Sequence, residues 1–255
     1  MIKKITLMCF LLSSLFIAAQ ETPDATSETK NTSWSFLVEP YLMFPNMKGD
    51  TQIGENLPAL GVDADTDNIF SHLKMGAMLY MEAKNDNWAI TSDFVYMKLG
   101  EDVTPTTLVQ SGEIEVKETI WELDGYRRIL PMLEVGVGLR LVSVSADADI
   151  VLFNGQSRSA DITETWVDPI IVVRSHNVIK DNFLLNLKGD IGGFGIGSDF
   201  TWQIQADAGY QFSDLFHLMV GYRYIGIDYE TGSGQDYFAY NIDTFGPEIR
   251  LGFRF

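Results

Sequence analysis

Apolar and polar residues alternate in the C-terminal part of the chain. Between residues 200 and 212 every second position is apolar, and the positions between them are polar or glycine. The apolar set is Phe200, Trp202, Ile204, Ala206, Ala208, Tyr210 and Phe212, and the other set is Thr201, Gln203, Gln205, Asp207, Gly209 and Gln211. A period of two puts successive side chains on opposite faces of a β-strand. The segment is therefore predicted to be a strand with one apolar and one polar face.

The end of the chain repeats this pattern with a charged face. Phe245, Ile249, Leu251, Phe253 and Phe255 share one side, and Glu248, Arg250, Gly252 and Arg254 share the other. Periodicity alone does not separate a β-sandwich, whose polar faces look into water, from a membrane barrel, whose polar face looks into the lumen. The lengths of the strands, the connections between them and the positions of aromatic residues distinguish these two folds.

These three features favour a membrane-spanning barrel. Leu215 to Glu230 is longer than the usual soluble strand, as a tilted crossing of ~9–11 residues with an extension requires. Short turns at 85–87, around Pro131, at 177–181 and at 213–214 alternate with longer connections, as periplasmic turns and outer loops do. Aromatic residues at both strand ends are typical of two interfacial girdles. They are Trp88, Phe183, Phe212 and Phe216 beside the short turns, and Phe200, Trp202, Tyr222 and Tyr224 nearer the other rim.

The predicted fold is all-β: a closed antiparallel transmembrane barrel of about ten strands, with twelve or eight as alternatives. The predicted strands are 34–44, 73–84, 87–99, 112–128, 133–149, 159–174, 182–192, 199–211, 215–230 and 237–254. Residues 47–53 and 59–63 are expected to form a hairpin, either above the membrane or as two more barrel strands. Residues 68–73 are expected to form a short helical turn in the same outer connection.

The N-terminus has the pattern of a secretory signal. Lys3 and Lys4 precede an apolar run from Ile5 to Ile17 and the small pair Ala18-Ala19. We expect residues 1–19 to be a cleaved signal peptide, 20–33 a flexible periplasmic lead, and 34–255 the barrel. A transmembrane helix is disfavoured because the run is shorter than the ~20 residues that a helical crossing needs.

Charge and cysteine usage narrow the functional classes. The formal charge is −17, and losing Lys3 and Lys4 with the signal makes it −19, which disfavours nucleic acid as a partner. The only cysteine, Cys9, lies in the predicted signal, so the mature chain is expected to have no disulfide and no thiolate chemistry. We expect no cofactor.

Several segments resemble a known family. They are Glu39-Pro40-Tyr41-Leu42, Trp166-Val167-Asp168-Pro169, Gly189 to Gln203 (GDIGGFGIGSDFTWQ), Gly221 to Tyr229 (GYRYIGIDY) and Gly246 to Phe255 (GPEIRLGFRF). Together they resemble the largely uncharacterised outer-membrane β-barrel proteins of Gram-negative bacteria. The resemblance implies location and fold, with a terminal aromatic strand signal for barrel insertion at Phe253 and Phe255. It implies no established activity.

Charged residues of both signs are predicted to line the lumen. The set is Glu39, Glu82, Asp93, Glu122, Arg128, Glu134, Arg140, Asp168, Arg174, Lys188, Asp190, Asp207, Arg223, Glu248, Arg250 and Arg254. A barrel of about ten strands has a narrow interior, so opposite charges there are expected to pair and to constrict or close the lumen. The alternative is a purely structural role, in which these charges only keep the interior hydrated and the barrel rigid.

Three other patterns are weaker candidates for chemistry. The glycines between Gly189 and Gly197 fit no phosphate-binding loop and are expected to bend and turn the chain at a barrel rim. Asp63, Asp65 and Asp67 resemble half of a calcium loop, and a merely solvated loop is the alternative. Ser71 and His72 are a remote candidate for a catalytic pair in an outer connection, because sequence neighbours rarely align as nucleophile and base.

The sequence therefore favours a non-enzymatic outer-membrane barrel with a charged, constricted lumen that serves envelope integrity or surface binding. Alternatives are a narrow channel for small solutes and a lipid- or peptide-processing enzyme at the outer rim. A soluble lipocalin-like barrel is disfavoured because it needs large apolar residues in its lumen. The expected partners are outer-membrane lipid and lipopolysaccharide, with the barrel-assembly machinery during insertion; the oligomeric state is open.

Overall fold

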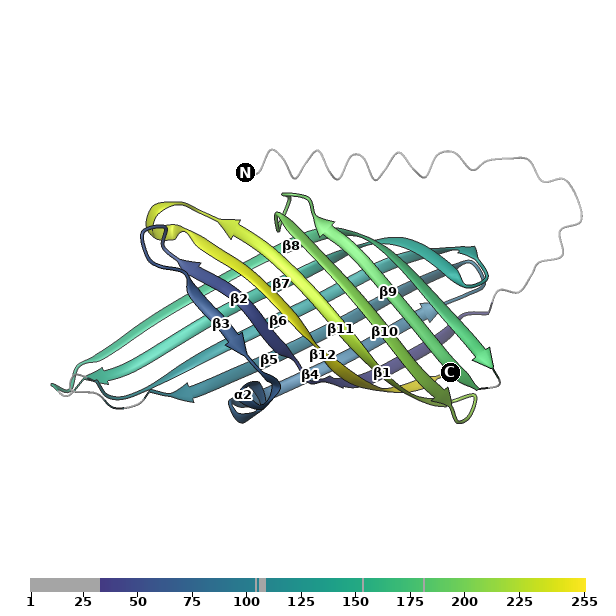
Figure 1. Cartoon of the computed structure of the whole chain (residues 1–255), viewed down its shortest axis with the longest axis horizontal. Coiled ribbons are helices and arrows are strands. Elements are labelled where there is room, and N and C mark those ends of the chain that lie inside the picture. Colours follow the sequence, from purple (N-terminus) through teal and green to yellow (C-terminus); the bar gives the residue numbers. More distant parts are fainter. Residues whose placement is uncertain (1–32, 104, 106–108, 153, 181) are drawn as a thin grey trace, which may run out of the picture. The chain divides into compact units, whose positions relative to one another are not determined.

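The computed structural model describes residues 33–103, 105, 109–152, 154–180 and 182–255. The predicted signal peptide (1–19) and all but the last residue of the predicted lead (20–33) lie outside these residues. The described part is built almost wholly of antiparallel strands (Figure 1). No helix in it is long and apolar enough to cross a bilayer.

Ten strands close into a barrel. They are β1 (Ser35–Met43), β4 (Leu73–Lys84), β5 (Trp88–Asp102), β6 (Val109–Leu130), β7 (Leu133–Leu152), β8 (Ser157–Lys180), β9 (Phe183–Gly193), β10 (Phe200–Gln211), β11 (Phe216–Thr231) and β12 (Phe238–Arg254). Each pairs with the next along the chain, and β1 pairs with both β4 and β12. At the seam, Phe36 N–H donates to Phe255 O at 2.7 Å and Phe255 N–H donates to Phe36 O at 2.9 Å. The predicted ten-strand closed barrel is confirmed.

A hairpin of β2 (Asn46–Ile53) and β3 (Leu60–Ala64) adds two strands without entering the closed ring. After β1 the chain turns at Phe44-Pro45, and β2 continues along the outer half of β12, from Asn46 beside Phe245 to Ile53 beside Phe238. A short helix, α2 (Thr66–Ser71), follows β3, and a 3-10 turn, η2 (Gly234–Asp236), joins β11 to β12. The hairpin expected between residues 47 and 63 thus lies at the outer end of the barrel.

One predicted turn is wrong. Residues 177–180, expected in a tight turn, continue strand β8, where Asn177 pairs with Leu185 and Val178 with Leu184. The Asn186 side chain also lies 2.8 Å from Nδ1 of His176, which links β8 and β9. Asparagine favours turns locally, but ladder hydrogen bonds to β9 outweigh that preference.

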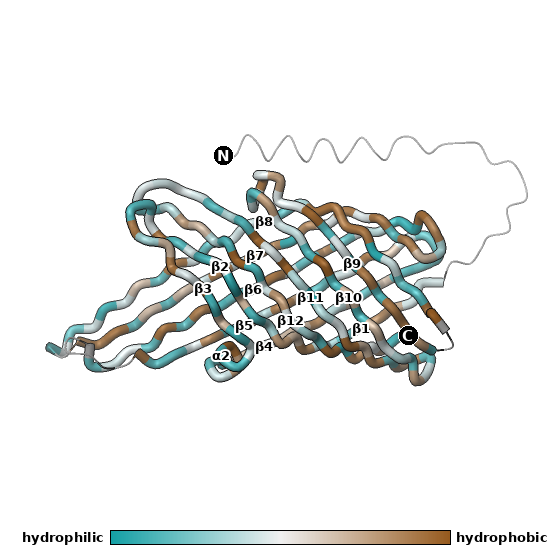
Figure 2. Tube along the Cα trace, in the orientation of Figure 1, coloured by the Kyte–Doolittle hydropathy of each residue, from teal (hydrophilic) through white to brown (hydrophobic). Residues whose placement is uncertain are grey.

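The barrel wall presents an apolar band to the outside. Val137 of β7 is 67% exposed, Ile171 of β8 53% and Val220 of β11 55%, all on outward positions of their strands. Hydrophobic and hydrophilic positions alternate along the strands in Figure 2. Aromatic rings in contact with one another border the band at both edges. At the lower edge, beside the short turns, they are Phe183, Tyr210, Phe212, Phe216 and Phe253. At the upper edge they are Trp202, Tyr224 and Phe245. Exposed hydrocarbon between two aromatic girdles is the surface of a barrel that spans a bilayer.

Beyond the upper girdle the polarity of the wall inverts. The strands β5 to β8 run on past the band towards the lower left of Figure 1. We call this region, together with β2, β3 and the outer ends of β11 and β12, the outer extension. It comprises residues 46–64, 97–102, 109–118, 143–152, 157–165, 226–231 and 238–244. On its outside, Lys98 pairs with Glu115 at 2.7 Å and Lys117 with Asp147 at 2.8 Å. The hydrogen bond that Lys117 donates to Asp147 raises the pKa of Lys117 and so keeps this ammonium charged. A charged outer surface belongs in water, so the extension lies above the membrane.

Candidate functional site in the barrel lumen

The charged residues predicted for the lumen all take inward positions, because they alternate with the lipid-facing residues of their strands. Most are fully or nearly fully buried, and Arg128, Lys188 and Arg254 are partly buried. They form three groups of ion pairs.

The first group is centred on Arg140 of β7. Its guanidinium donates to Glu122 and to Asp190, each at 2.7 Å, and to the Thr201 hydroxyl at 2.9 Å. Lys188 pairs with Glu122 as well, and with Asp124 at 3.3 Å. Four strands, β6, β7, β9 and β10, are thereby tied together across the interior.

The second group lies nearer the periplasmic end. Arg174 pairs with Glu82 at 2.6 Å and with Glu134 at 2.7 Å. Arg128 adds a contact to Glu134 at 3.1 Å, and Lys84 one to Glu82 at 2.9 Å. These pairs connect β4 with β7 and β8, and β4 is a neighbour of neither strand in the sheet. The ion pairs therefore cross the lumen instead of following its wall.

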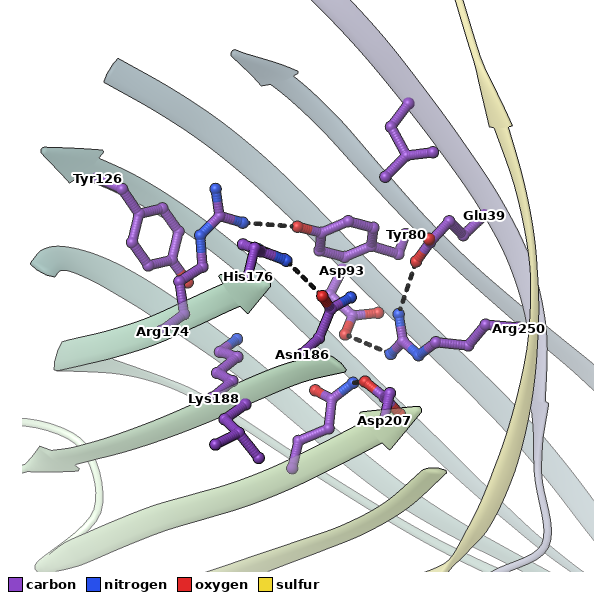
Figure 3. A pocket seen from close by; sticks show the side chains of 13 residues that line it. Glu39, Tyr80, Asp93, Tyr126, Arg174, His176, Asn186, Lys188, Asp207 and Arg250 are labelled. Carbon is purple, nitrogen blue, oxygen red and sulfur yellow. Dashed lines mark hydrogen bonds and ion pairs between the residues drawn. The ribbon is translucent and has the colours of Figure 1, made fainter. Parts of the chain in front are cut away.

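The third group joins the seam strands to the rest of the barrel. Arg223 of β11 pairs with Asp93 of β5 at 2.8 Å, and Arg250 of β12 pairs with Glu39 of β1 at 3.2 Å. Arg250 also lies 3.0 Å from Glu248 and 3.8 Å from Asp93. The contact between β5 and β11 again spans the interior. Figure 3 shows a second such contact, between Asp93 of β5 and Arg250 of β12.

Three residues of the predicted set have other roles. Asp168 accepts a hydrogen bond from the Ser198 hydroxyl at 2.8 Å, which ties the β9–β10 turn to β8. Asp207 accepts from Gln205 at 2.8 Å, and that amide also reaches Glu248. Arg254 lies at the periplasmic mouth. The lumen network thus depends on neutral hydrogen-bond donors as well as on cations.

Sequence reasoning missed the tyrosines of the network. The Tyr41 hydroxyl donates to Asp93 at 2.8 Å and accepts from Arg223 at 2.8 Å, and the Tyr80 hydroxyl accepts from Arg174 at 2.9 Å. The alternation carried a signal for both, because Tyr41 lies two residues from Glu39 and Tyr80 two residues from Glu82.

Little free space is left in the middle of the lumen. The cavity drawn in Figure 3, between Tyr80, Tyr126, Arg174 and Arg250, has a volume of about 40 Å³. One enclosed water needs at least ~10–15 Å³ of such space, so the cavity has room for only a few waters. A larger cavity of about 210 Å³, whose lining includes Glu82, Arg128 and Arg254, lies towards the periplasmic end. The ion pairs therefore narrow the lumen most strongly between this cavity and the outer extension.

An apolar layer lies above the ion pairs. Val142, Ile225 and Ile242 are buried there, and the rings of Trp166 and Tyr229 stack with centroids 3.9 Å apart. The Trp166 indole N–H donates to the Ser198 hydroxyl at 2.8 Å, so its polar atom is satisfied. The lumen is thus occupied at two levels, first by paired charges and then by packed hydrocarbon.

Several solved structures are similar to this chain in architecture. They include the protease OmpT of Escherichia coli (11% identity, TM-score 0.49, covering 91% of this chain and 99% of that chain) and the attachment invasion locus protein Ail of Yersinia pestis (10%, 0.37, 88% and 99%). The toluene transporter TodX of P. putida is a third (6%, 0.33, 89% and 91%). No protein-family model and no curated protein matches the sequence.

At these identities and TM-scores the likenesses carry no argument, and the fold follows from the strand pairings of the chain itself. The chain has an outer-membrane β-barrel fold. A closed barrel with a lipid-facing band between aromatic girdles is the form in which β-structure crosses a Gram-negative outer membrane, which is where this chain resides.

The three acidic residues considered for calcium are dispersed. Asp63 lies 3.6 Å from Lys48, and Asp65 caps helix α2 by accepting from the backbone N–H of Asn68 at 2.8 Å, while Asp67 lies in the first turn of that helix. Within the described ranges, no group of three or more His, Cys, Asp or Glu residues could hold a metal ion.

Ser71 and His72 lie together at the end of α2, with Ser71 Oγ 3.1 Å from His72 Nδ1. The same Nδ1 is 2.7 Å from the Asn68 carbonyl, and the Ser71 hydroxyl donates to that carbonyl at 2.8 Å. A carbonyl only accepts, so this arrangement places the proton on Nδ1 and leaves no free lone pair there to take the serine proton.

The terminal aromatic residues lie on the outer wall at the periplasmic rim. Phe253 packs against Phe216 with ring centroids 5.5 Å apart, and Phe255 is 66% exposed. Both side chains are available to the surroundings of the last strand, as a recognition signal would need.

Proposed function

We propose that this protein is a non-enzymatic outer-membrane barrel with a closed lumen, which anchors the outer extension as a binding structure at the cell surface. The single observation that carries the proposal is the filling of the lumen by ion pairs that cross from β5 to β11 and from β4 to β8. A transport path would need continuous space, and between the periplasmic cavity of about 210 Å³ and the apolar layer the ion pairs leave a cavity of only about 40 Å³.

The absence of catalysis is part of this proposal. It is supported by the hydrogen bond that directs His72 Nδ1 to the Asn68 carbonyl, away from a role as base for Ser71. The proposed partners are outer-membrane lipid and lipopolysaccharide around the apolar band, and the barrel-assembly machinery at Phe253 and Phe255 during insertion.

Conductance tests the closed lumen. Purified protein is reconstituted into planar bilayers, and its insertion is checked by heat-modifiable migration in gels. We expect no stable single-channel steps from the wild type. The double variant Arg140→Ala/Trp166→Ala removes one guanidinium from the ion pairs and the largest ring from the apolar layer, and it should conduct intermittently. Large, stable steps from the wild type would instead support the narrow-channel alternative and overturn the proposal.

A further inference from the structure

A large apolar cavity lies inside the outer extension. Its volume is about 350 Å³, and its walls include Met47, Val62, Leu99, Val144, Ile162 and Tyr240. These side chains come from opposite sides of the barrel mouth, where the β2–β3 hairpin faces the long strands β5 to β8. Small-molecule sites commonly measure about 300–1,000 Å³ and are mostly apolar, so the cavity has the size and character of such a site.

Crossing the membrane does not account for this cavity. The outer extension carries ion pairs on its outside and hydrocarbon on its inside, which is the reverse of the membrane-spanning wall below it. On β3, Leu60, Val62 and Ala64 all point into the cavity, while Asp63 points outward to Lys48. Apolar side chains turned inward around free space lose contacts that an apolar molecule in that space would restore.

The polar groups of the cavity restrict its occupant. Among the described lining residues, Glu118 is the one with an ionisable carboxylate; it is buried, and its Oε1 accepts from the Tyr240 hydroxyl at 2.7 Å. Burial raises the pKa of Glu118, and the hydrogen bond from Tyr240 opposes this shift by favouring the ionised carboxylate. In that ionised form the carboxylate repels an anionic ligand and accepts a hydrogen bond from a hydroxyl group. Building on the anchoring role proposed above, we propose that the cavity binds a neutral, hydrocarbon-rich molecule bearing a hydroxyl group, such as a long-chain alcohol.

The barrel wall is interrupted beside this site. Pairing between β1 and β4 ends at Pro40 and Leu79, and above that level the described strand pairings do not join β4 to β2 or β3. Helix α2 fills part of the break: Ile69 is buried, and the Phe70 ring stacks on Phe44 with centroids 5.4 Å apart. The wall is therefore closed there by side chains and not by a hydrogen-bonded ladder.

A smaller cavity of about 60 Å³ lies in this break. It is lined by Leu42 and Ala77, which face the lipid, together with Met43, Met78 and Met97, which face the interior. Met97 also lines the large cavity, so this methionine side chain borders both spaces. Methionine is unbranched and adapts readily to a changing neighbour. The ligand therefore enters from the outer leaflet through this break.

Binding is tested with the full mature protein in lipid nanodiscs. N-phenyl-1-naphthylamine is the fluorescent probe, with 1-dodecanol and dodecanoate as competitors and empty nanodiscs as the background. We expect one saturable site above that background, displaced by 1-dodecanol and not by dodecanoate. Glu118→Gln should let dodecanoate compete. Absence of saturable binding above empty nanodiscs would overturn the proposal, and stronger displacement by dodecanoate in the wild type would overturn the ligand class.

Filling the cavity with a larger side chain tests the site, and the same substitution one inward position further along β7 is the matched control. Ala146 lines the cavity and Ala148, the next inward residue of β7, is not among its walls. Ala146→Phe should weaken probe binding by about tenfold or more, whereas Ala148→Phe should change it by less than about twofold. Heat-modifiable migration shows that both variants are folded, and equal affinity of Ala146→Phe and wild type would contradict the site. Conductance is measured separately, so a conducting wild type that still binds the probe would refute only the closed lumen.

The route is tested by association kinetics. Gly76 lines the smaller cavity, and a Cβ there would meet Leu73 only at ordinary contact distance, 3.8 Å. Gly76→Leu should therefore slow both binding and release of the probe without changing its equilibrium affinity. Gly125→Leu, at a lipid-facing glycine with open space around it, is the control and should leave the rates unchanged. Wild-type rates in Gly76→Leu would refute entry from the bilayer.

Discussion

Arg140 offers the sharpest test of the lumen network. The residue is fully buried and its guanidinium contacts Glu122, Asp190 and Thr201. Arg140→Met keeps much of the side-chain volume and removes the charge. Glu122 keeps Lys188 as a partner, but Asp190 loses the cation that contacts it at 2.7 Å. The change therefore leaves one buried carboxylate uncompensated.

The expected loss in the free energy of unfolding follows from the formal charge of this group. The group holds two cations (Arg140, Lys188) and three carboxylates (Glu122, Asp124, Asp190), a formal charge of 2 − 3 = −1, which becomes −2 in Arg140→Met. Removing one partner of a buried ion pair costs about 3–5 kcal/mol, and we expect the lower end because Lys188 stays in place. Arg140→Met/Asp190→Asn restores the charge of −1 and should recover most of the loss.

The free energy of unfolding is measured by urea titration of the protein in phospholipid vesicles, followed by tryptophan fluorescence. Lys117→Met, which breaks the solvent-exposed pair with Asp147, is the control and should lower the free energy of unfolding far less. If Arg140→Met is no more harmful than Lys117→Met, or if the double variant is less stable than the single one, the ion pairs do not hold the lumen as described.

Three further outcomes are expected. Deleting Phe255 removes the backbone pair with Phe36 and the terminal aromatic ring, and should lower the yield of heat-modifiable barrel in outer-membrane fractions; an unchanged yield would contradict a role in insertion. Gly197→Val should reduce folding yield, because a Cβ there would come within 2.4 Å of an Asp168 carboxylate oxygen, and normal yield would show that the turn can move away. Ser71→Ala and His72→Ala should give the same traces as wild type in protease and lipase assays, and a lost activity would revive the enzyme alternative.

The alternation of residue types alone determined the strands and their two faces. Along β10, and along β12 from Phe245 onward, apolar residues alternate with polar residues or glycine, and the apolar ones form the lipid-facing wall. The charged residues between them face inward because a closed barrel in a bilayer has no other place for them. The ends of the strands were harder to predict from the sequence. Asn177 has a local preference for turns, and only pairing with the neighbouring strand β9 makes it part of β8.

Only the tertiary structure decided which face is inside in the outer extension. From Ser143 to Asp149 the chain alternates as regularly as in the membrane, but here the polar residues face outward and Val144 and Ala146 face the interior. The physical reason is the solvent: hydrocarbon surrounds the barrel below the upper girdle and water surrounds it above, and the alternation does not record where that boundary falls. A lipocalin-like barrel was disfavoured because the lumen was expected to be charged, yet an apolar interior is present in the upper part of the barrel. Which cation meets which carboxylate was also undetermined, because Arg223 and Asp93 lie far apart in the sequence and only barrel closure brings them together.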